Sequence, residues 1–241
     1  MMIALLTRGG LGLGCCTPSG VALTTVLFDI DGTLIDSNDA HAAAWVKAFA
    51  QFGITTDPAL VRRGIGMGGD KLMPKVSGIE EDSPLGKQIA TRRGEIFTQQ
   101  LLPTLVPFDG ARELVAAVKA RGLAAVAASS ASKGDLRALL GVAGLDQLMD
   151  ETTSSDDAEA SKPDPDIIQA ALQRAKAQPS EAIMIGDTPY DVEAARRAGV
   201  TVVAVRCGGW TDEDLKGAAA IHDGPRDLLT RLDSLLGPPR R

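Results

Sequence analysis

The sequence predicts an α/β fold in which a doubly wound parallel sheet is interrupted by an inserted helical domain. Short apolar runs that end in polar or glycine residues alternate with stretches of helical periodicity, which is the pattern of a parallel sheet covered by helices. One long segment, residues 38–105, breaks this alternation with helices and loops alone. The chain has 241 residues, 44% of them hydrophobic, and this is enough for a buried core.

Four apolar runs are predicted as buried strands, because each is too short for a helix and is followed by polar or glycine residues. They span residues 26–28, 124–128, 182–185 and 202–205. Two helices between them have recognisable ends. Residues 111–121 stop at Gly122, and residues 166–176 begin after Asp164 and Pro165.

Residues 38–105 are expected to form the inserted cap domain. Residues 21–37 and 106–233 would then form the core domain, with tails at 1–20 and 234–241. The first cap helix carries Trp45 and Phe49 at helical spacing, so these rings are expected to pack rather than to bind a ligand. The glycine-rich turn at 64–69 lacks the order of a Walker loop or a dinucleotide fingerprint, so no nucleotide site is predicted.

The composition argues against nucleic acid and anionic membranes as partners, since the net charge is -6 and the pI is about 5.0. The three cysteines form no disulfide framework and the two histidines are too few for a zinc site, so a cytoplasmic location is expected. In residues 1–20, glycines interrupt the apolar stretch and the only charged side chain is that of Arg8. That segment is predicted to be a loose tail, or the result of a start codon placed too early, rather than a signal peptide.

The strongest chemical pattern is a pair of carboxylates at the end of the first strand. The segment reads Phe28-Asp29-Ile30-Asp31-Gly32-Thr33-Leu34. Because side chains alternate along an extended chain, Asp29 and Asp31 can project toward the same side. The carboxyl ends of parallel strands are also where open α/β sheets place their sites. An ordinary acidic turn would give the same pair, so the motif alone does not decide the function.

Further polar residues follow later strands. Ser129 ends the run 124–128, Lys162 lies in a Ser-Lys-Pro-Asp segment, and Asp187 follows the run 182–185. Since all of them lie at or after strand ends, they can converge with Asp29 on one crevice.

A helix is expected to begin just after Asp187. Thr188 is its predicted N-cap and Pro189 its first helical residue. Asp191 then lies in the first turn, where it can either stabilise the helix dipole or take part in a metal site.

These motifs, in this order and spacing, resemble the haloacid dehalogenase-like (HAD) hydrolase superfamily, and the position of the cap resembles its phosphoglycolate phosphatase and β-phosphoglucomutase branch. The resemblance covers residues 21–233 and implies a Rossmann-like core with a helical cap. It implies that Asp29 is the nucleophile and Asp31 the general acid and base. Lys162 would be the cation between the nucleophile and the phosphate.

The resemblance also implies a magnesium site and phosphate contacts. Asp29, Asp187 and the backbone carbonyl of Asp31 would bind Mg²⁺. Thr33 and Ser129 would contact the phosphate, and Ser130, which adjoins Ser129, stays open as an alternative.

Substrate contacts from the cap are less well defined. His41 occupies a spacing similar to that of many capped family members, and it can face the site or pack near the hinge. Arg62, Arg63 and Lys71 are candidate anion contacts, although each can also be a solvated charge.

The residue types suit phosphoryl transfer on physical grounds as well. A carboxylate that attacks a phosphate monoester brings one anion to another, so a metal ion and a lysine are needed to offset the repulsion. A covalent intermediate on Asp29 divides one difficult displacement into two, with Asp31 placed for proton transfer. Oxygen ligands such as Asp29 and Asp187 suit magnesium better than zinc.

The leading prediction is therefore a magnesium-dependent phosphatase that acts on a small phosphorylated metabolite such as phosphoglycolate or a sugar phosphate, in a chain that is a monomer or a weak dimer. A phosphotransferase similar to β-phosphoglucomutase is the alternative, and a non-catalytic phosphate-binding module is a third hypothesis. A dehalogenase is disfavoured, because the dehalogenases of this superfamily characteristically lack an aspartate at the position of Asp31.

Overall fold

The computed structural model describes residues 22–237, and its centre is one parallel sheet of six strands. The strand β1 (Thr25–Phe28) lies between β2 (Ala124–Ala128) and β4 (Ala182–Gly186). The others are β3 (Glu151–Thr153), β5 (Thr201–Val205) and β6 (Ala220–His222), in the order β3-β2-β1-β4-β5-β6. Strands β2 and β3 are added on one side of β1, and β4, β5 and β6 are added on the other side. This reversal of strand order opens a crevice at the carboxyl end of β1.

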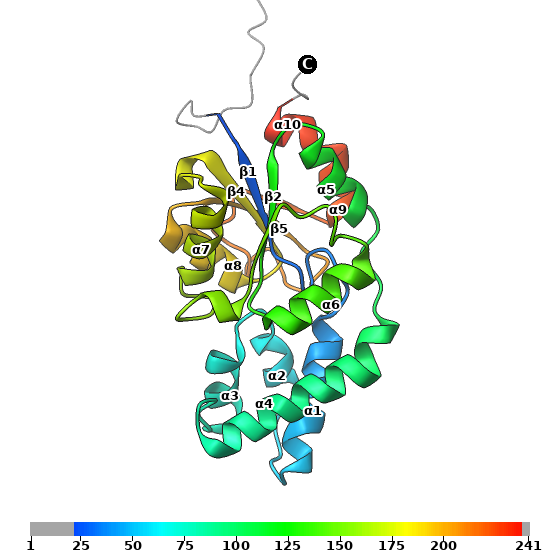
Figure 1. Ribbon diagram of the computed structural model, residues 1–241, viewed down its shortest axis with the longest axis vertical. Helices are drawn as coiled ribbons and strands as arrows, with labels where there is room; N and C mark the ends of the chain where they lie inside the picture. Colours follow the sequence, from blue (N-terminus) through cyan, green and yellow to red (C-terminus); the bar gives the residue numbers. More distant parts are fainter. Residues whose placement is uncertain (1–21, 238–241) are drawn as a thin grey trace, which may run out of the picture.

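Alternate residues of β1 enter two different hydrophobic cores, one on each face of the sheet. Val26 and Phe28 lie in the first core, and Leu27 lies in the second. The first core is covered by α5 (Ala111–Lys119), α6 (Lys133–Ala143), α9 (Pro225–Thr230) and α10 (Leu232–Leu236). The second is covered by α7 (Asp166–Ala175) and α8 (Pro189–Ala198). Helices cover the sheet on both faces (Figure 1), and burial on both faces explains why the central strands are almost entirely apolar.

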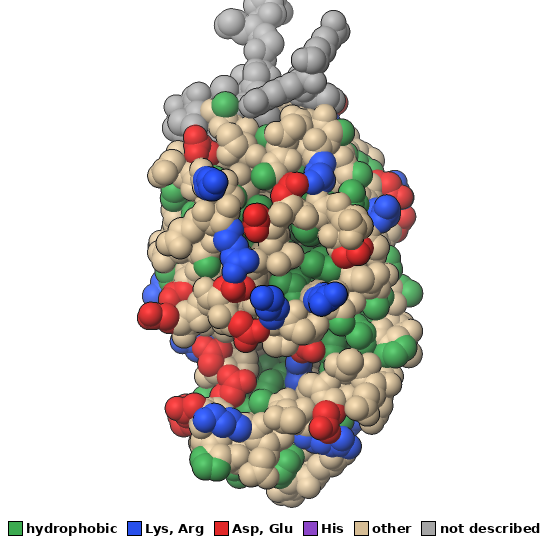
Figure 2. Space-filling model, viewed as in Figure 1, with side chains coloured by type: hydrophobic (Ala, Val, Ile, Leu, Met, Phe, Trp, Pro, Cys, Tyr) green, Lys and Arg blue, Asp and Glu red, His purple; other side chains and the backbone are tan. Residues whose placement is uncertain are grey.

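Most of the segment between β1 and β2, before α5, forms a helical lobe beyond the carboxyl end of the sheet (Figure 1). It contains α1 (Asn38–Gln51), α2 (Pro58–Gly64), α3 (Gly69–Ser77) and α4 (Pro84–Ile96), followed by a π-helical turn (Phe97–Leu101) and a 3-10 turn (Leu102–Thr104). Further 3-10 turns lie at Ser155–Asp157 and Pro179–Glu181. The rings of Trp45 and Phe49 stack 5.6 Å apart inside this lobe, as expected, although Trp45 also reaches the cavity next to the sheet. Figure 2 shows acidic and basic side chains interspersed over one face of the molecule.

The predicted α/β fold is confirmed, and the four predicted strands lie within one residue of their expected positions. The edge strands β3 and β6 were not predicted, since each has only three residues and β3 has no apolar run. The C-terminal tail was expected to begin at residue 234, and this boundary is wrong. The helix α10 continues to Leu236, whose side chain is fully buried. The expectation for residues 1–20 lies outside the described residues. Within residues 22–237, no helix is long and apolar enough to cross a membrane.

Candidate active site

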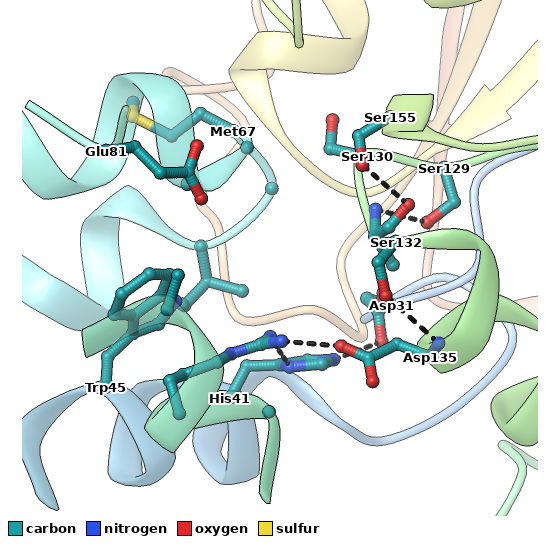
Figure 3. A pocket seen from close by; sticks show the side chains of 18 of the residues that line it. Asp31, His41, Trp45, Met67, Glu81, Ser129, Ser130, Ser132, Asp135 and Ser155 are labelled. Atoms are coloured by element: carbon teal, nitrogen blue, oxygen red, sulfur yellow. Dashed lines mark hydrogen bonds and ion pairs between the residues drawn. The ribbon is translucent and has the colours of Figure 1, made fainter. Parts of the chain in front are cut away.

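A cavity of about 210 Å³ lies between the helical lobe and the carboxyl end of the sheet. Side chains from both parts line it and face each other across it (Figure 3). Those from the lobe include His41, Trp45, Met67, Glu81 and Arg93, and those from the sheet side include Asp29, Asp31, Ser129, Ser130 and Asp135. The cavity therefore brings most of the predicted core residues together with His41.

Asp31 lies at this cavity with its carboxylate held by two neighbours. Its Oδ1 lies 2.5 Å from the hydroxyl of Ser37, which donates to it, and 2.7 Å from Nε2 of His41. His41 is buried and its ring stacks on Phe97, with 4.1 Å between the ring centroids. Both interpretations of His41 from the sequence are therefore found together, since it faces the cavity and also packs.

Arg93 joins His41 to the core helix α6. Its guanidinium lies 2.5 Å from Nδ1 of His41 and 2.6 Å from Oδ2 of Asp135. Because a guanidinium only donates, His41 accepts at Nδ1 and carries its proton at Nε2, from which it donates to Asp31. Burial alone would raise the pKa of Asp31, but His41, Ser37 and Arg93 outweigh this and hold it below its ordinary value. Asp31 is therefore held as a carboxylate.

Ser129 and Ser130 follow β2 at the cavity wall. The Oγ of Ser129 accepts a hydrogen bond of 3.0 Å from the amide of Ala131, so its own proton stays free to be donated. The Oγ of Ser130 is buried and has no hydrogen-bond partner among residues 22–237. Each hydroxyl can donate to a bound anion, so the choice between them stays open.

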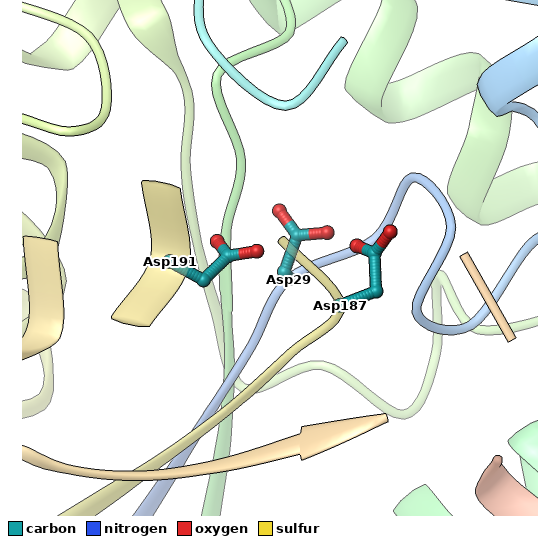
Figure 4. A group of neighbouring side chains, drawn as sticks. All are labelled: Asp29, Asp187 and Asp191. Atoms are coloured by element: carbon teal, nitrogen blue, oxygen red, sulfur yellow. The ribbon is translucent and has the colours of Figure 1, made fainter. Parts of the chain in front are cut away.

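A buried acidic cluster lies beside the cavity, at the carboxyl ends of β1 and β4. It consists of Asp29, Asp187 and Asp191, whose carboxylates lie close together in Figure 4 and offer oxygens within 4.8 Å of one another. The carboxylate of Asp31 is not a member of this cluster. The predicted magnesium ligand from Asp31 is its backbone carbonyl, and that stays a prediction.

The start of α8 positions the last member of the cluster. Thr188 is the N-cap and Pro189 follows it, as predicted. One carboxylate oxygen of Asp191, Oδ2, accepts from both the amide and the hydroxyl of Thr188, at 3.0 and 2.7 Å. The other oxygen, Oδ1, lies 2.8 Å from the ammonium of Lys162. Asp191 therefore caps its helix and also belongs to the site.

Lys162 is fully buried, and its ammonium is enclosed by acceptors. Besides Asp191, it contacts Oδ1 of Asp29 at 2.6 Å and the carbonyl oxygen of Ala128 at 2.7 Å. Burial opposes the charge of Lys162, but Asp191 and Asp29 outweigh this and raise its pKa. The lysine is thus a fixed cation that touches the predicted nucleophile.

The cluster is suited to a hard cation. Burial raises the pKa of Asp29 to about 7, with Lys162 opposing this shift and Asp191 and Asp31 adding to it. Burial together with Asp29 and Asp191 also raises the pKa of Asp187 well above its ordinary value. One lysine cannot balance three adjacent carboxylates, so a divalent cation at these oxygens would relieve their repulsion, and an all-oxygen donor set fits Mg²⁺.

Asn38 and Thr33 hold Asp187 in place. The Nδ2 of Asn38 donates to Oδ2 of Asp187 at 3.0 Å, while its own Oδ1 is buried without a partner among residues 22–237. The hydroxyl of Thr33 lies 3.0 Å from Asp187 and 3.1 Å from Asp29. Thr33 does not line the cavity, so the geometry gives it a supporting position instead of the predicted phosphate contact.

The predicted anion contacts of the cap are also used elsewhere. Arg62 lies 2.6 Å from Oδ1 of Asp39 and 2.7 Å from the carbonyl of Gly208, outside the cavity lining. Two further ion pairs connect the lobe to the core, Arg63 with Asp214 at 3.0 Å and Lys71 with Asp164 at 2.7 Å. These side chains join the two parts of the molecule and do not point into the cavity.

Three charged residues of the cavity were missed by the sequence analysis, namely Glu81, Arg93 and Asp135. Each lies in or beside a helix whose local pattern is that of an ordinary charged surface. The packing of α4 against α1 and the ion pair of Arg93 with Asp135 bring the lobe and α6 together at the cavity, and no short motif indicates this arrangement.

The sequence as a whole matches one family of enzymes. Residues 26–205 match the haloacid dehalogenase-like hydrolases. The chain belongs to this family. N-acetylmuramic acid 6-phosphate phosphatase from Pseudomonas aeruginosa is 29% identical to it over 218 residues, which cover 89% of this chain and 96% of that protein. Phosphoglycolate phosphatase from Rhodospirillum rubrum is 30% identical over 82% of this chain and 86% of that one.

The crystal structure of a hydrolase from Pseudomonas syringae is also similar, with a TM-score of 0.80 and 30% sequence identity over 88% of this chain and 99% of that one. Membership of the HAD hydrolase family confirms the resemblance seen in the motifs, and with it the assignment of the chain as an enzyme. The relatives from Pseudomonas aeruginosa and Rhodospirillum rubrum are both phosphatases by name.

Proposed function

We propose that this HAD hydrolase is a magnesium-dependent phosphatase that acts on a small phosphorylated metabolite through an aspartyl-phosphate on Asp29. The observation that carries the proposal is the position of Asp29, which lines the cavity while its carboxylate contacts the ammonium of Lys162 and belongs to the acidic cluster. A phosphate in the cavity would then meet a nucleophile, a cation and the hydroxyls of Ser129 and Ser130 at once.

In the first step, an oxygen of Asp29 attacks phosphorus while the bond to the leaving alcohol breaks. Lys162 offsets the charge that develops on the phosphoryl oxygens. Asp29, Asp187 and the backbone carbonyl of Asp31 would hold Mg²⁺, which supplies further positive charge at the same oxygens. Asp191 keeps Lys162 in place through their 2.8 Å ion pair.

Asp31 would transfer the protons. It gives a proton to the alcohol oxygen as that group leaves, and it takes a proton from the water that hydrolyses the aspartyl-phosphate. In the structure Asp31 is a carboxylate with a lowered pKa, which is the form that the second step requires. The arrival of a phosphate dianion beside it would raise its pKa and favour the protonated form for the first step.

The helical lobe, residues 38–105, would act as the cap that encloses the substrate. The cavity of about 210 Å³ is smaller than the roughly 300–1,000 Å³ of pockets for drug-sized ligands, so it suits a small metabolite. Phosphoglycolate and sugar phosphates are both small enough, and relatives are named for substrates of both kinds. We propose that the chain works in the cytoplasm as a monomer or weak dimer.

A direct test is the release of p-nitrophenol from p-nitrophenyl phosphate with magnesium. The wild-type chain should turn this substrate over, and Asp29→Asn should not, because an amide keeps an oxygen ligand but cannot attack phosphorus. Asp146→Asn makes the same chemical change at an exposed position and should keep full activity. Activity of Asp29→Asn within about tenfold of the parent would refute the assignment.

The same preparation distinguishes hydrolysis from a mutase reaction. β-Glucose 1-phosphate is supplied with magnesium and a trace of the bisphosphate, and free phosphate and glucose 6-phosphate are measured together. Phosphate release should exceed isomer formation. A faster appearance of glucose 6-phosphate would favour the mutase alternative.

A further inference from the structure

Glu81 presents a free carboxylate to the cavity from the side opposite the serines. It lies between α3 and α4, lines the cavity, and points from the lobe toward Ser129 and Ser130 in Figure 3. Among residues 22–237, this carboxylate has no hydrogen bond and no ion pair. Every other charged side chain on the cavity wall has a partner within 3 Å, and these side chains are Asp29, Asp31, Arg93 and Asp135.

The loop that carries Glu81 holds it in this position. A Cβ atom at Gly69 would collide with Oε1 of Glu81, so the carboxylate rests directly on the backbone at the start of α3. A Cβ atom at Gly86 would collide with the carbonyl oxygens of Glu80 and Glu81, which shows that the loop packs closely on the first turn of α4. The loop therefore places the carboxylate at the cavity wall, next to the backbone of Gly69.

The surroundings leave the charge of Glu81 poorly compensated. Burial and the nearby Asp70 raise its pKa, with Arg93 acting in the opposite direction. The guanidinium of Arg93 is already engaged by His41 and Asp135, and its Nε is buried without a hydrogen-bond partner among residues 22–237. A ligand that donates hydrogen bonds or carries a positive charge would stabilise Glu81, and a second anionic group there would be repelled.

We infer that Glu81 determines which alcohol is accepted: it binds the hydroxyl or amino groups of a sugar or amino-sugar phosphate and disfavours phosphate esters that carry a second acid group. This inference rests on the proposed phosphatase activity, and it narrows the substrate class of the same site. With the phosphate held at Asp29 and the serines, the alcohol part must extend toward the lobe. There it meets the carboxylate of Glu81 beside Trp45 and Met67.

The test compares kcat/KM for glucosamine 6-phosphate, glucose 6-phosphate and phosphoglycolate, with p-nitrophenyl phosphate as a reference that has neither hydroxyl nor acid groups. The wild-type chain should prefer glucosamine 6-phosphate to glucose 6-phosphate, and both to phosphoglycolate. Glu81→Gln should lower the ratio of glucosamine 6-phosphate to phosphoglycolate by about tenfold, the usual difference between a charged and a neutral acceptor. The change should appear mainly in KM, since Glu81 does not touch the phosphate.

Glu95→Gln is the matched control, because Glu95 lies exposed on α4 in an ion pair with Arg92. It should leave all four substrates unchanged. Thermal unfolding of Glu81→Gln at the wild-type temperature would show that the variant folds, so that a change in the substrate ratio reports on the cavity. An unchanged substrate ratio in that variant, or a wild-type preference for phosphoglycolate, would overturn the role of Glu81. A wild-type chain that turns over none of the four substrates would instead refute the phosphatase itself.

Discussion

Replacing Asp191 with asparagine should cost much of the stability of the core, although it changes few atoms. Asp191 uses one carboxylate oxygen to cap α8 and the other to pair with Lys162. An asparagine has a single side-chain oxygen, so it can accept from Thr188 or face Lys162, but it cannot do both. Whichever orientation it takes, its NH₂ group then faces another donor.

The size of the effect follows from the distances. At 2.8 Å and an effective dielectric constant of about 20, the attraction between Lys162 and Asp191 is about 6 kcal/mol. The repulsion lost between Asp191 and Asp29, at up to 4.8 Å and with Asp29 about half ionised near pH 7, offsets about 2 kcal/mol of this. The net loss of about 4 kcal/mol lies in the range measured for broken buried ion pairs. It corresponds to a fall of about 8–16 °C in Tm for a chain of this length.

Thermal unfolding followed by circular dichroism measures this change. The buffer should contain a chelator, because a metal ion bound at the acidic cluster would add its own stabilisation. Glu193→Gln is the control, since Glu193 lies on the same helix and forms an exposed ion pair with Arg196 that should contribute little. If Asp191→Asn unfolds at the same temperature as Glu193→Gln, the buried pair does not stabilise the fold and the reasoning fails.

Three further predictions concern the chemistry. Asp31→Asn should accumulate aspartyl-phosphate in rapid-quench experiments with an activated substrate, because the attacking water then lacks a base. If no phosphoenzyme is found and steady-state hydrolysis is unchanged, Asp31 has no part in the mechanism. Gly208→Ala should weaken magnesium binding, measured by calorimetry, because a Cβ atom there would collide with Asp187. Gly141→Ala is its control, since a Cβ atom at Gly141 meets nothing within 4 Å, and equal affinities would count against Asp187 as a ligand. Removal of metal with a chelator should abolish phosphate release and added magnesium should restore it, whereas activity that persists after chelation would contradict the metal requirement.

The sequence predicted the sheet well because its central strands are buried on both faces. Such strands appear as short apolar runs, and the acidic residues after them lie where open α/β sheets place their sites. The cap of α8 was predictable for a similar reason, since Thr188, Pro189 and Asp191 act within one turn of helix. The sequence was therefore sufficient for features that depend on residues close together in the chain or on the order of the strands.

The sequence was least informative where the outcome depends on how the lobe packs on the core. Arg62 was a reasonable anion contact by type and position, yet it points to Asp39 and Gly208. Arg93 gave no signal, although its guanidinium contacts His41 and Asp135 at the cavity. A helix such as α4 has charged residues on several faces, and only the tertiary arrangement decides which of them is buried at the site.

The charges around the cavity explain why, in the proposed mechanism, a divalent cation must bind before the phosphate of the substrate can bind. The positive charges of the site are already used, because Lys162 is shared by Asp29 and Asp191 and Arg93 is held by Asp135. A phosphate dianion that enters the cavity therefore meets the acidic side chains of Asp29, Asp31 and Glu81 on its wall, and no cationic side chain among the described lining residues is free to offset them. A divalent cation at the acidic cluster would reverse this balance at the position where the phosphate must lie. Without the metal ion, the acidic side chains around Asp29 would repel the phosphate of the substrate. Metal binding and phosphate binding should therefore be coupled.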